Sequence, residues 1–236
     1  MSGHSKWNTI KRQKGVNDQK RAALFTKLMR AIALAVREGG NDPQNNPRLR
    51  LAIERAKSFN VPKQNIERPL EHHEGETIEA FIFDAVGPGN ASLIIEGTTD
   101  NKNRTINEIR LILTKHASKM AQEGSVRWAF VRKGVLIVEK VQFSLKDDDA
   151  LFALINAGAE DVKETADTLE AVMEPEKLET VRTKCVETNI PIADTSLHWM
   201  AQQEIPIPQA AAAALEALIE NLEDHPDVQD VWTNTP

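Results

Sequence analysis

The spacing of apolar residues changes its period once along this chain, at the polar segment Glu71–Glu76. Before this segment, apolar residues recur every three or four positions, which is typical of amphipathic helices. After it, short apolar runs bounded by Gly, Pro and Asn indicate β-strands. Because 236 residues also exceed the usual size of one domain, the sequence predicts a helical domain followed by separately folded α+β parts.

Three helices are predicted before residue 71. The first runs from Asn17, a candidate N-cap, to the pair Gly39–Gly40, which suits the left-handed C-terminal position. Its apolar arc is formed by Phe25, Leu28, Met29, Ile32 and Val36. The second helix opens at Asn46 and Pro47, as cap and first-turn proline, and a short third helix begins at Pro62. The second helix is expected to bury Leu49, Ile53 and Ala56.

The net charge changes sign at the same place as the apolar period. Residues 1–70 hold fifteen basic and five acidic residues, a charge of +10, whereas residues 71–236 hold fourteen basic and thirty acidic residues, a charge of −16. The overall charge of −6 therefore averages two unlike parts. So basic a segment indicates a polyanion partner, namely nucleic acid. The alternative is a solvated basic surface that has no partner.

The cations of the basic segment fall into an arm and two helix faces. The arm precedes the first helix and is polar enough to become ordered on a nucleic-acid backbone. On a helical wheel, the first helix places its cations opposite the apolar arc, and the second places two cations on its outer face. The candidate nucleic-acid-binding residues are Lys6, Lys11, Arg12 and Lys14 in the arm, Lys20, Lys27, Arg30 and Arg37 on the first helix, and Arg48 and Arg55 on the second.

A helix-turn-helix reader of duplex sequence is not indicated by this segment. The Gly39–Asn46 connection is longer than the usual turn of three or four residues. No predicted helix carries the pattern of Asn, Gln and Arg that reads base edges in the major groove. Recognition of the nucleic-acid backbone, or of structured RNA, therefore fits better than tight sequence specificity.

Beyond residue 76 the pattern predicts a hairpin, with strands at 80–86 and 91–97 on either side of the turn Gly87–Asn90. A polar loop at 98–103 then leads into a helix, and a third strand is expected at Ser125–Val131.

The start of that helix supplies two further candidates for phosphate contact, Lys102 and Arg104. Free backbone N–H groups and the helix dipole favour an anion at this position. The alternative is a capped turn in which Asp100 and Asn101 hydrogen-bond the backbone.

From Lys133 the predicted order of elements is βαββαβ, a complete ferredoxin-like unit. An alanine-rich helix at 209–223 and a strand at 228–233 follow it, and they are too small to bury a core alone. We therefore expect them to complete the earlier sheet. The predicted fold class is a multidomain α+β protein with a basic N-terminal helical domain at 1–75, a split α/β sheet domain at 76–132 plus 206–236, and an inserted ferredoxin-like domain at 133–205.

Catalytic and metal chemistry find little support in the sequence. Neither a glycine-rich phosphate loop nor a Ser, His and Asp order occurs, and Cys185 is the single cysteine. The paired His72 and His73 are adjacent, and adjacent side chains rarely reach one metal ion. We expect no cofactor, no metal and no catalytic residue, with an enzyme acting on a phosphorylated small molecule as the outside alternative.

The apolar runs fall far short of the roughly 20 residues that span a bilayer. The first residues also lack the apolar segment of a secretory signal. A cytoplasmic location without a membrane partner is therefore expected.

Several segments resemble the YebC/PmpR family, a bacterial group related to the mitochondrial translational activator of cytochrome c oxidase. The resemblance runs from residue 3 to about residue 140 and, more loosely, to the end of the chain. It rests on the motifs at Gly3–Trp7, Phe25–Leu28, Gly39–Pro43, Asn46–Arg50, Gly87–Gly89, Thr99–Thr105 and Gly124–Val126. Two departures lie in the central domain, where the strand before Gly87 has fewer aromatic residues and Ala117–Met120 replaces glycines.

The resemblance implies three domains, a cytoplasmic location and no known catalysis. Members of the family are commonly described as probable transcriptional regulators that bind DNA, and some are described as acting in translation at the ribosome. We therefore predict a nucleic-acid-binding regulator of gene expression. Its partner is duplex DNA in a transcriptional role, or ribosomal or structured RNA and the ribosome itself in a translational role.

Overall fold

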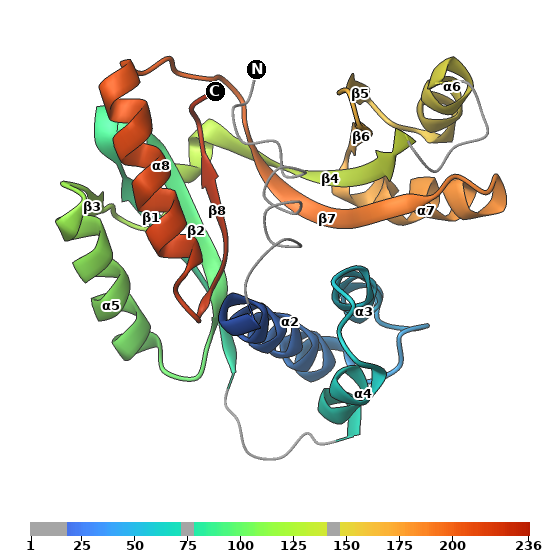
Figure 1. The fold of residues 1–236 in the computed structure, drawn as a ribbon, viewed down its shortest axis with the longest axis horizontal. Coiled ribbons are helices and arrows are strands. Elements are labelled where there is room, and N and C mark those ends of the chain that lie inside the picture. Colours follow the sequence, from blue (N-terminus) through green and yellow to red (C-terminus); the bar gives the residue numbers. More distant parts are fainter. Residues whose placement is uncertain (1–17, 72–77, 141–146) are drawn as a thin grey trace.

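The computed structural model describes residues 18–71, 78–140 and 147–236, in which helices precede two four-stranded antiparallel sheets. Figure 1 shows two lobes, each built on one sheet, with the helical unit beside the lower part of one lobe and below the other. This arrangement confirms the predicted fold class, a multidomain α+β protein with a ferredoxin-like insertion. Among the described helices, none combines the length and the apolar character that crossing a lipid bilayer requires.

The helical unit contains α2 (Asp18–Gly39), α3 (Pro47–Ser58) and α4 (Lys63–Glu71). Asn46 fixes the corner between α2 and α3. Its side-chain oxygen accepts a hydrogen bond from the Leu49 N–H at 3.0 Å, which confirms the predicted N-cap. Its amide nitrogen donates to the carbonyl groups of Ala35 and Gly40, at 2.7 and 2.8 Å, and so ties the end of α2 to the start of α3.

The central sheet has the strand order β3-β1-β2-β8 and carries two helices on one face (Figure 1). The predicted hairpin is confirmed, because the two strands pair from Glu79↔Thr99 to Val86↔Ser92. The C-terminal strand pairs with the second strand of the hairpin, so the end of the chain returns to the sheet that the hairpin began. The elements are β1 (Glu79–Val86), β2 (Ser92–Thr99), α5 (Lys102–Lys115), β3 (Lys119–Met120), α8 (Gln209–Glu223) and β8 (Val228–Thr233).

The strand predicted at Ser125–Val131 is wrong. The chain instead turns there, forms a short 3-10 helix at Arg127–Ala129, and enters a strand only at Phe130. The buried carboxylate of Asp84 explains the turn, since it accepts hydrogen bonds from the Val126 N–H at 3.3 Å and from Arg127 Nε at 2.8 Å. An extended backbone would leave that carboxylate buried without these donors.

The second sheet has the order β5-β6-β4-β7, with all pairs antiparallel, as a ferredoxin-like βαββαβ unit requires. Strands β4 and β7 pair from Phe130↔Ala201 to Val138↔Ile192, and they are the segments by which the chain enters and leaves this lobe. The elements are β4 (Phe130–Glu139), α6 (Asp147–Ala157), β5 (Asp161–Glu164), β6 (Thr168–Met173), α7 (Leu178–Glu187) and β7 (Ile192–Ala201).

Each face of this second sheet is covered by a different set of helices. Leu136 and Val138 of β4 point into the core that α6 and α7 close. Val135 and Ile137, on the opposite face, belong to the same hydrophobic core as the buried residues of α2, α3 and α4. The helical unit therefore completes its core with the open face of the inserted sheet.

Two fully buried valines of β4 test this shared core. Val135 faces α2, α3 and α4, whereas Val138 faces α6 and α7. We expect Val135→Ala and Val138→Ala each to lower the free energy of unfolding by about 2 kcal/mol, through lost burial and a cavity. Only Val135→Ala should also speed hydrogen exchange in α2 and α3. Equal exchange in α2 and α3 for both variants would contradict a shared core.

Candidate nucleic-acid interface

The structure places the predicted phosphate-binding cations in three different situations. Those of the arm, Lys6, Lys11, Arg12 and Lys14, lie outside the described residues, as does the side chain of Lys20 in the first turn of α2. Those on α2 and α3 divide between a face turned toward the central sheet and a face turned toward solvent. Lys102 and Arg104, at the start of α5, lie on the central-sheet side of the contact between the helical unit and the central sheet.

Lys27 and Arg30 lie opposite the apolar arc of α2, as expected, but they face another part of the protein, and the expected outer-face position of Arg55 is wrong. These three side chains point at residues 223–230, the end of α8 and the start of β8, which we call the acidic segment. Lys27 Nζ donates to the carbonyl group of Glu223, and Arg30 forms an ion pair with Asp227. Phosphate binding by these cations stays a prediction, and in this structure the protein's own acidic segment occupies them.

Asp227 is the centre of this junction. Its carboxylate is 1% exposed and accepts hydrogen bonds from two guanidinium groups and two hydroxyl groups. These donors are Arg30 on α2, Arg104 at 2.8 Å, Thr105 Oγ1 at 2.6 Å and Thr99 Oγ1 at 3.2 Å. Burial alone would raise the pKa of Asp227, but these donors outweigh it and lower the pKa to about 2. The carboxylate is therefore ionised at any physiological pH.

The backbone of the acidic segment is held as closely as its side chains. The Thr98 N–H donates to the Asp227 carbonyl group at 2.9 Å. A side chain on Gly97 would place its Cβ 2.0 Å from that carbonyl oxygen, so the close crossing over β2 requires glycine.

Arg55 and Lys27 extend the junction along α3 and α2. Arg55 makes a two-pronged ion pair with Asp230 of β8, with nitrogen–oxygen distances of 3.2 and 3.3 Å. Burial lowers the pKa of Lys27 to about 8, despite the carboxylates nearby. Lys27 therefore carries its charge at neutral pH in a poorly solvated position.

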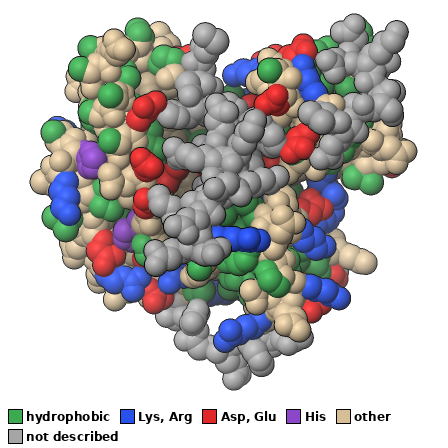
Figure 2. Space-filling model, in the orientation of Figure 1, with side chains coloured by type: hydrophobic (Ala, Val, Ile, Leu, Met, Phe, Trp, Pro, Cys, Tyr) green, Lys and Arg blue, Asp and Glu red, His purple; other side chains and the backbone are tan. Residues whose placement is uncertain are grey.

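The remaining predicted cations of the helical unit lie at its surface. Arg48 is 57% exposed and pairs with Glu38 of α2, whereas Arg37 donates to the Ile78 carbonyl group at 2.6 Å. Lys57 and Arg68 are exposed as well. In Figure 2, several Lys and Arg side chains gather over the region that α2, α3 and α4 occupy in Figure 1. This surface, unlike the one facing the acidic segment, is open to a large partner.

The start of α5 forms a capped turn. The Asn101 side chain accepts a hydrogen bond from the Arg104 N–H at 3.1 Å, as one of the two predicted alternatives requires. Arg104 pairs with Asp100 and Asp227, so the anion bound beside this helix N-terminus is a carboxylate of the protein itself. Lys102 is exposed, and its contact with phosphate stays a prediction.

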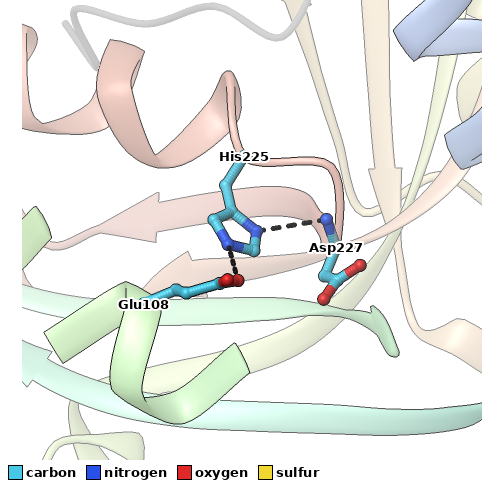
Figure 3. Close-up of side chains that lie close together, drawn as sticks. All are labelled: Glu108, His225 and Asp227. Carbon is cyan, nitrogen blue, oxygen red and sulfur yellow. Dashed lines mark hydrogen bonds and ion pairs between the residues drawn. The ribbon is translucent and has the colours of Figure 1, made fainter. Parts of the chain in front are cut away.

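Glu108, His225 and Asp227 offer ligand atoms within 4.8 Å of one another, which is close enough to hold a cation. Figure 3 shows that both nitrogens of His225 are already used. Nδ1 accepts from the Asp227 N–H at 3.1 Å, so the ring proton is on Nε2, which donates to Glu108 at 3.0 Å. Because two guanidinium groups already neutralise Asp227, we interpret the cluster as a structural network that holds the turn before β8.

Sequence reasoning missed the acidic side of this junction, Asp227 and Asp230. The available signal was the acidic segment itself, which places Glu223, Asp224, Asp227 and Asp230 within eight residues. Its significance depended on knowing that β8 lies beside the basic helices, through contacts between positions 197 and 175 residues apart.

The fold and this junction define a class of multidomain α+β protein in which a basic helical unit packs on two acidic sheet lobes. Two family models match the chain, one described as the TACO1/YebC protein N-terminal domain over residues 5–76 and one as the TACO1/YebC second and third domain over residues 78–235. The chain therefore belongs to the TACO1/YebC family, which confirms the resemblance seen in the sequence.

Relatives and one solved structure agree with this assignment over nearly the whole chain. A protein of Desulforamulus reducens is 40% identical over 99% of this chain and 98% of its own length, and one of Desulfosudis oleivorans is 43% identical over 99% and 96%. Both are named probable transcriptional regulatory protein. The crystal structure of a conserved hypothetical protein from Aquifex aeolicus is similar with a TM-score of 0.89 and 35% identity, over 98% of this chain and 97% of that one.

The low pKa of Asp227 predicts a stability contribution that acid removes. The folded pKa of about 2 lies below the ordinary 3.8, so the contribution is fully present above pH 3.8 and is lost as the pH falls through 2. Its size is roughly 2 kcal/mol. We expect Asp227→Asn to reduce the free energy of unfolding by about 2–4 kcal/mol at pH 7, because two guanidinium groups lose their counter-charge.

Urea unfolding at pH 7 and near pH 3 measures both effects. The difference in stability between the wild type and Asp227→Asn should shrink at the lower pH. The matched control is Asp161→Asn, which removes an exposed carboxylate on β5 and should change stability little. A constant difference at both pH values would contradict the role assigned to Asp227.

Proposed function

We propose that this protein is a nucleic-acid-binding regulator of gene expression that grips the sugar–phosphate backbone through its N-terminal helical unit and the preceding arm. The observation that carries the proposal is the concentration of charge, +10 over residues 1–70 against −16 over the rest. Lys and Arg neutralise phosphates and release condensed counter-ions, a binding contribution that needs no particular base sequence. The acidic lobes repel nucleic acid, so the grip is confined to the basic end of the molecule.

Duplex DNA is the first candidate partner, since the relatives are named probable transcriptional regulatory proteins. Backbone contacts of this kind position a protein on DNA without reading its sequence. The predicted contacts are those of Lys6, Lys11, Arg12, Lys14 and Lys20, together with the surface cations Arg37, Arg48 and Lys102.

A translational role through ribosomal or structured RNA is the second candidate. The observation that favours it is the seven-residue connection 40–46 between α2 and α3, since helix-turn-helix readers use three or four residues. A unit without a helix presented to the major groove suits an irregular RNA backbone as well as a duplex.

Removing the four positive charges of the arm tests whether it binds the nucleic-acid backbone. We expect the variant with Lys6, Lys11, Arg12 and Lys14 all changed to Gln to bind a 30-base-pair DNA duplex at least tenfold more weakly than the wild type near 100 mM salt. The slope of log affinity against log salt should fall by about 3–4, because each lost phosphate contact removes about 0.9. Fluorescence anisotropy over a salt series measures both quantities.

The matched control removes four exposed lysines from the acidic lobes, Lys115, Lys119, Lys163 and Lys177, with the same change in net charge. This control should keep the wild-type salt slope. If both variants lose binding equally, the helical unit and arm have no special part in it and the proposal fails.

Selection from random duplexes, with ribosome co-sedimentation at physiological salt, separates the two candidates. We expect discrimination among duplex sequences within about tenfold, against the 10³ or more of a dedicated reader. A sharp motif would establish a sequence-specific DNA regulator, and a flat selection with co-sedimenting ribosomes would favour the translational role.

A further inference from the structure

The helical unit makes two chemically different contacts with the rest of the molecule. Toward the inserted lobe the contact has an apolar centre, with Val135 and Ile137 inside the core of α2, α3 and α4, and the ion pairs Arg50–Glu179 and Glu54–Arg182 lie beside it. Toward the central sheet it is ionic, made by Lys27, Arg30 and Arg55. Within the described part of the chain, no hydrophobic core includes both these helices and the central sheet. The first contact resists separation in water, whereas other ions can replace the second.

The acidic segment presents carboxylates to the helices, and these groups resemble the phosphates that a nucleic-acid backbone would present. A carboxylate and a phosphodiester each offer two oxygens with a shared negative charge, and Arg binds both in a two-pronged geometry. Asp230 accepts Arg55 in this way, and Asp227 accepts Arg30. Asp227, just before β8, and Asp230, within β8, therefore present two carboxylates to cations of α2 and α3.

We propose that the face of α2 and α3 carrying Lys27, Arg30 and Arg55 is a second polyanion-binding surface, which the acidic segment (223–230) holds closed as a tethered substitute for phosphate. This proposal rests on the proposed function and adds its regulation. A long nucleic acid gripped by the arm competes with Asp227 and Asp230 for these cations. Displacement of the acidic segment then adds contacts that a short or weakly bound polyanion does not reach.

The poor solvation of the Lys27 charge favours replacement of the acidic segment by nucleic acid. Its charge is held in a poorly solvated position, which the lowered pKa of about 8 reflects. Opening the junction would return Lys27 to water or to a phosphate, and this gain offsets part of the loss of the ion pairs. The apolar contact with β4 stays intact in this motion, so the helices keep their place on the inserted sheet while the acidic segment moves away from them.

The test neutralises the acidic segment in the full-length protein and measures binding to the same 30-base-pair duplex. Asp230→Asn removes the counter-charge of Arg55 and keeps the shape of the side chain. We expect about three- to tenfold tighter binding and a salt slope steeper by about 1, because the freed Arg55 reaches an additional phosphate. Asp161→Asn makes the same chemical change on the exposed strand β5 and corrects for the effect of net charge.

A double variant shows whether the gain comes from the freed cation. Asp230→Asn combined with Arg55→Gln should return affinity and slope to the wild-type values. If Asp230→Asn is too unstable to purify, hydrogen exchange of the wild-type protein supplies the second measurement. The Thr98 amide, which donates to the Asp227 carbonyl group, should exchange faster when saturating duplex is added.

The outcomes separate this proposal from the proposed function. Absence of duplex binding by the wild type and by every variant would overturn the proposed function itself. If the wild type binds duplex and Asp230→Asn matches Asp161→Asn in affinity and salt slope, the proposal of a second, closed binding surface is wrong, and the proposed function stands. Unchanged or slower exchange at Thr98 on addition of duplex would contradict the second, closed binding surface in the same way.

Discussion

The burial of one carboxylate, that of Asp227, sets how the helical unit meets the central sheet. An ionised group that is 1% exposed is tolerated only when donors surround it, and here they come from α2, α5 and β2. Such a network contributes little net stability compared with an apolar core, because desolvation cancels much of the attraction. Its effect is on arrangement, since it fixes the register of β8 against β2 and the position of α2 across the edge of the central sheet.

The pattern of charge takes a different meaning once the junction is known. From the sequence, the −16 of residues 71–236 showed only that the basic charge is concentrated in the first 70 residues. In the structure, part of that charge neutralises the basic helices from within. The cations of the helical unit thus divide into those that an internal partner satisfies and those at the surface, such as Arg48 and Lys57. This division separates the predicted contacts with nucleic acid into immediate ones and ones that require a structural change.

Local chemistry determines most of this fold, and for that reason much of it could be predicted. The Asn46–Pro47 cap, the turn at Gly87–Asn90 and the alternating strands each depend on neighbouring residues. The error at Ser125–Val131 has a distant cause, the buried Asp84 some 42 positions earlier, whose hydrogen bonds bend a segment of strand-like composition. The internal partners of the predicted phosphate-binding cations could not be predicted for the same reason. A helical wheel shows that Arg30 opposes the apolar arc of α2, but it does not show that Asp227 lies against it.

The route of the chain through β4 and β7 has a consequence for how such a protein evolves. Phe130 and Ala201 are direct partners, so the inserted lobe leaves and rejoins its host sheet at adjacent positions. A domain whose two ends lie side by side can be inserted into an existing gene without disturbing the fold of the domain that receives it. Here, however, one face of the inserted sheet completes the hydrophobic core of α2, α3 and α4. A descendant without the inserted lobe would lose Val135 and Ile137 from the core of the helical unit and leave that core open to water, and so the helical unit and the insertion are expected to be inherited or lost as a pair.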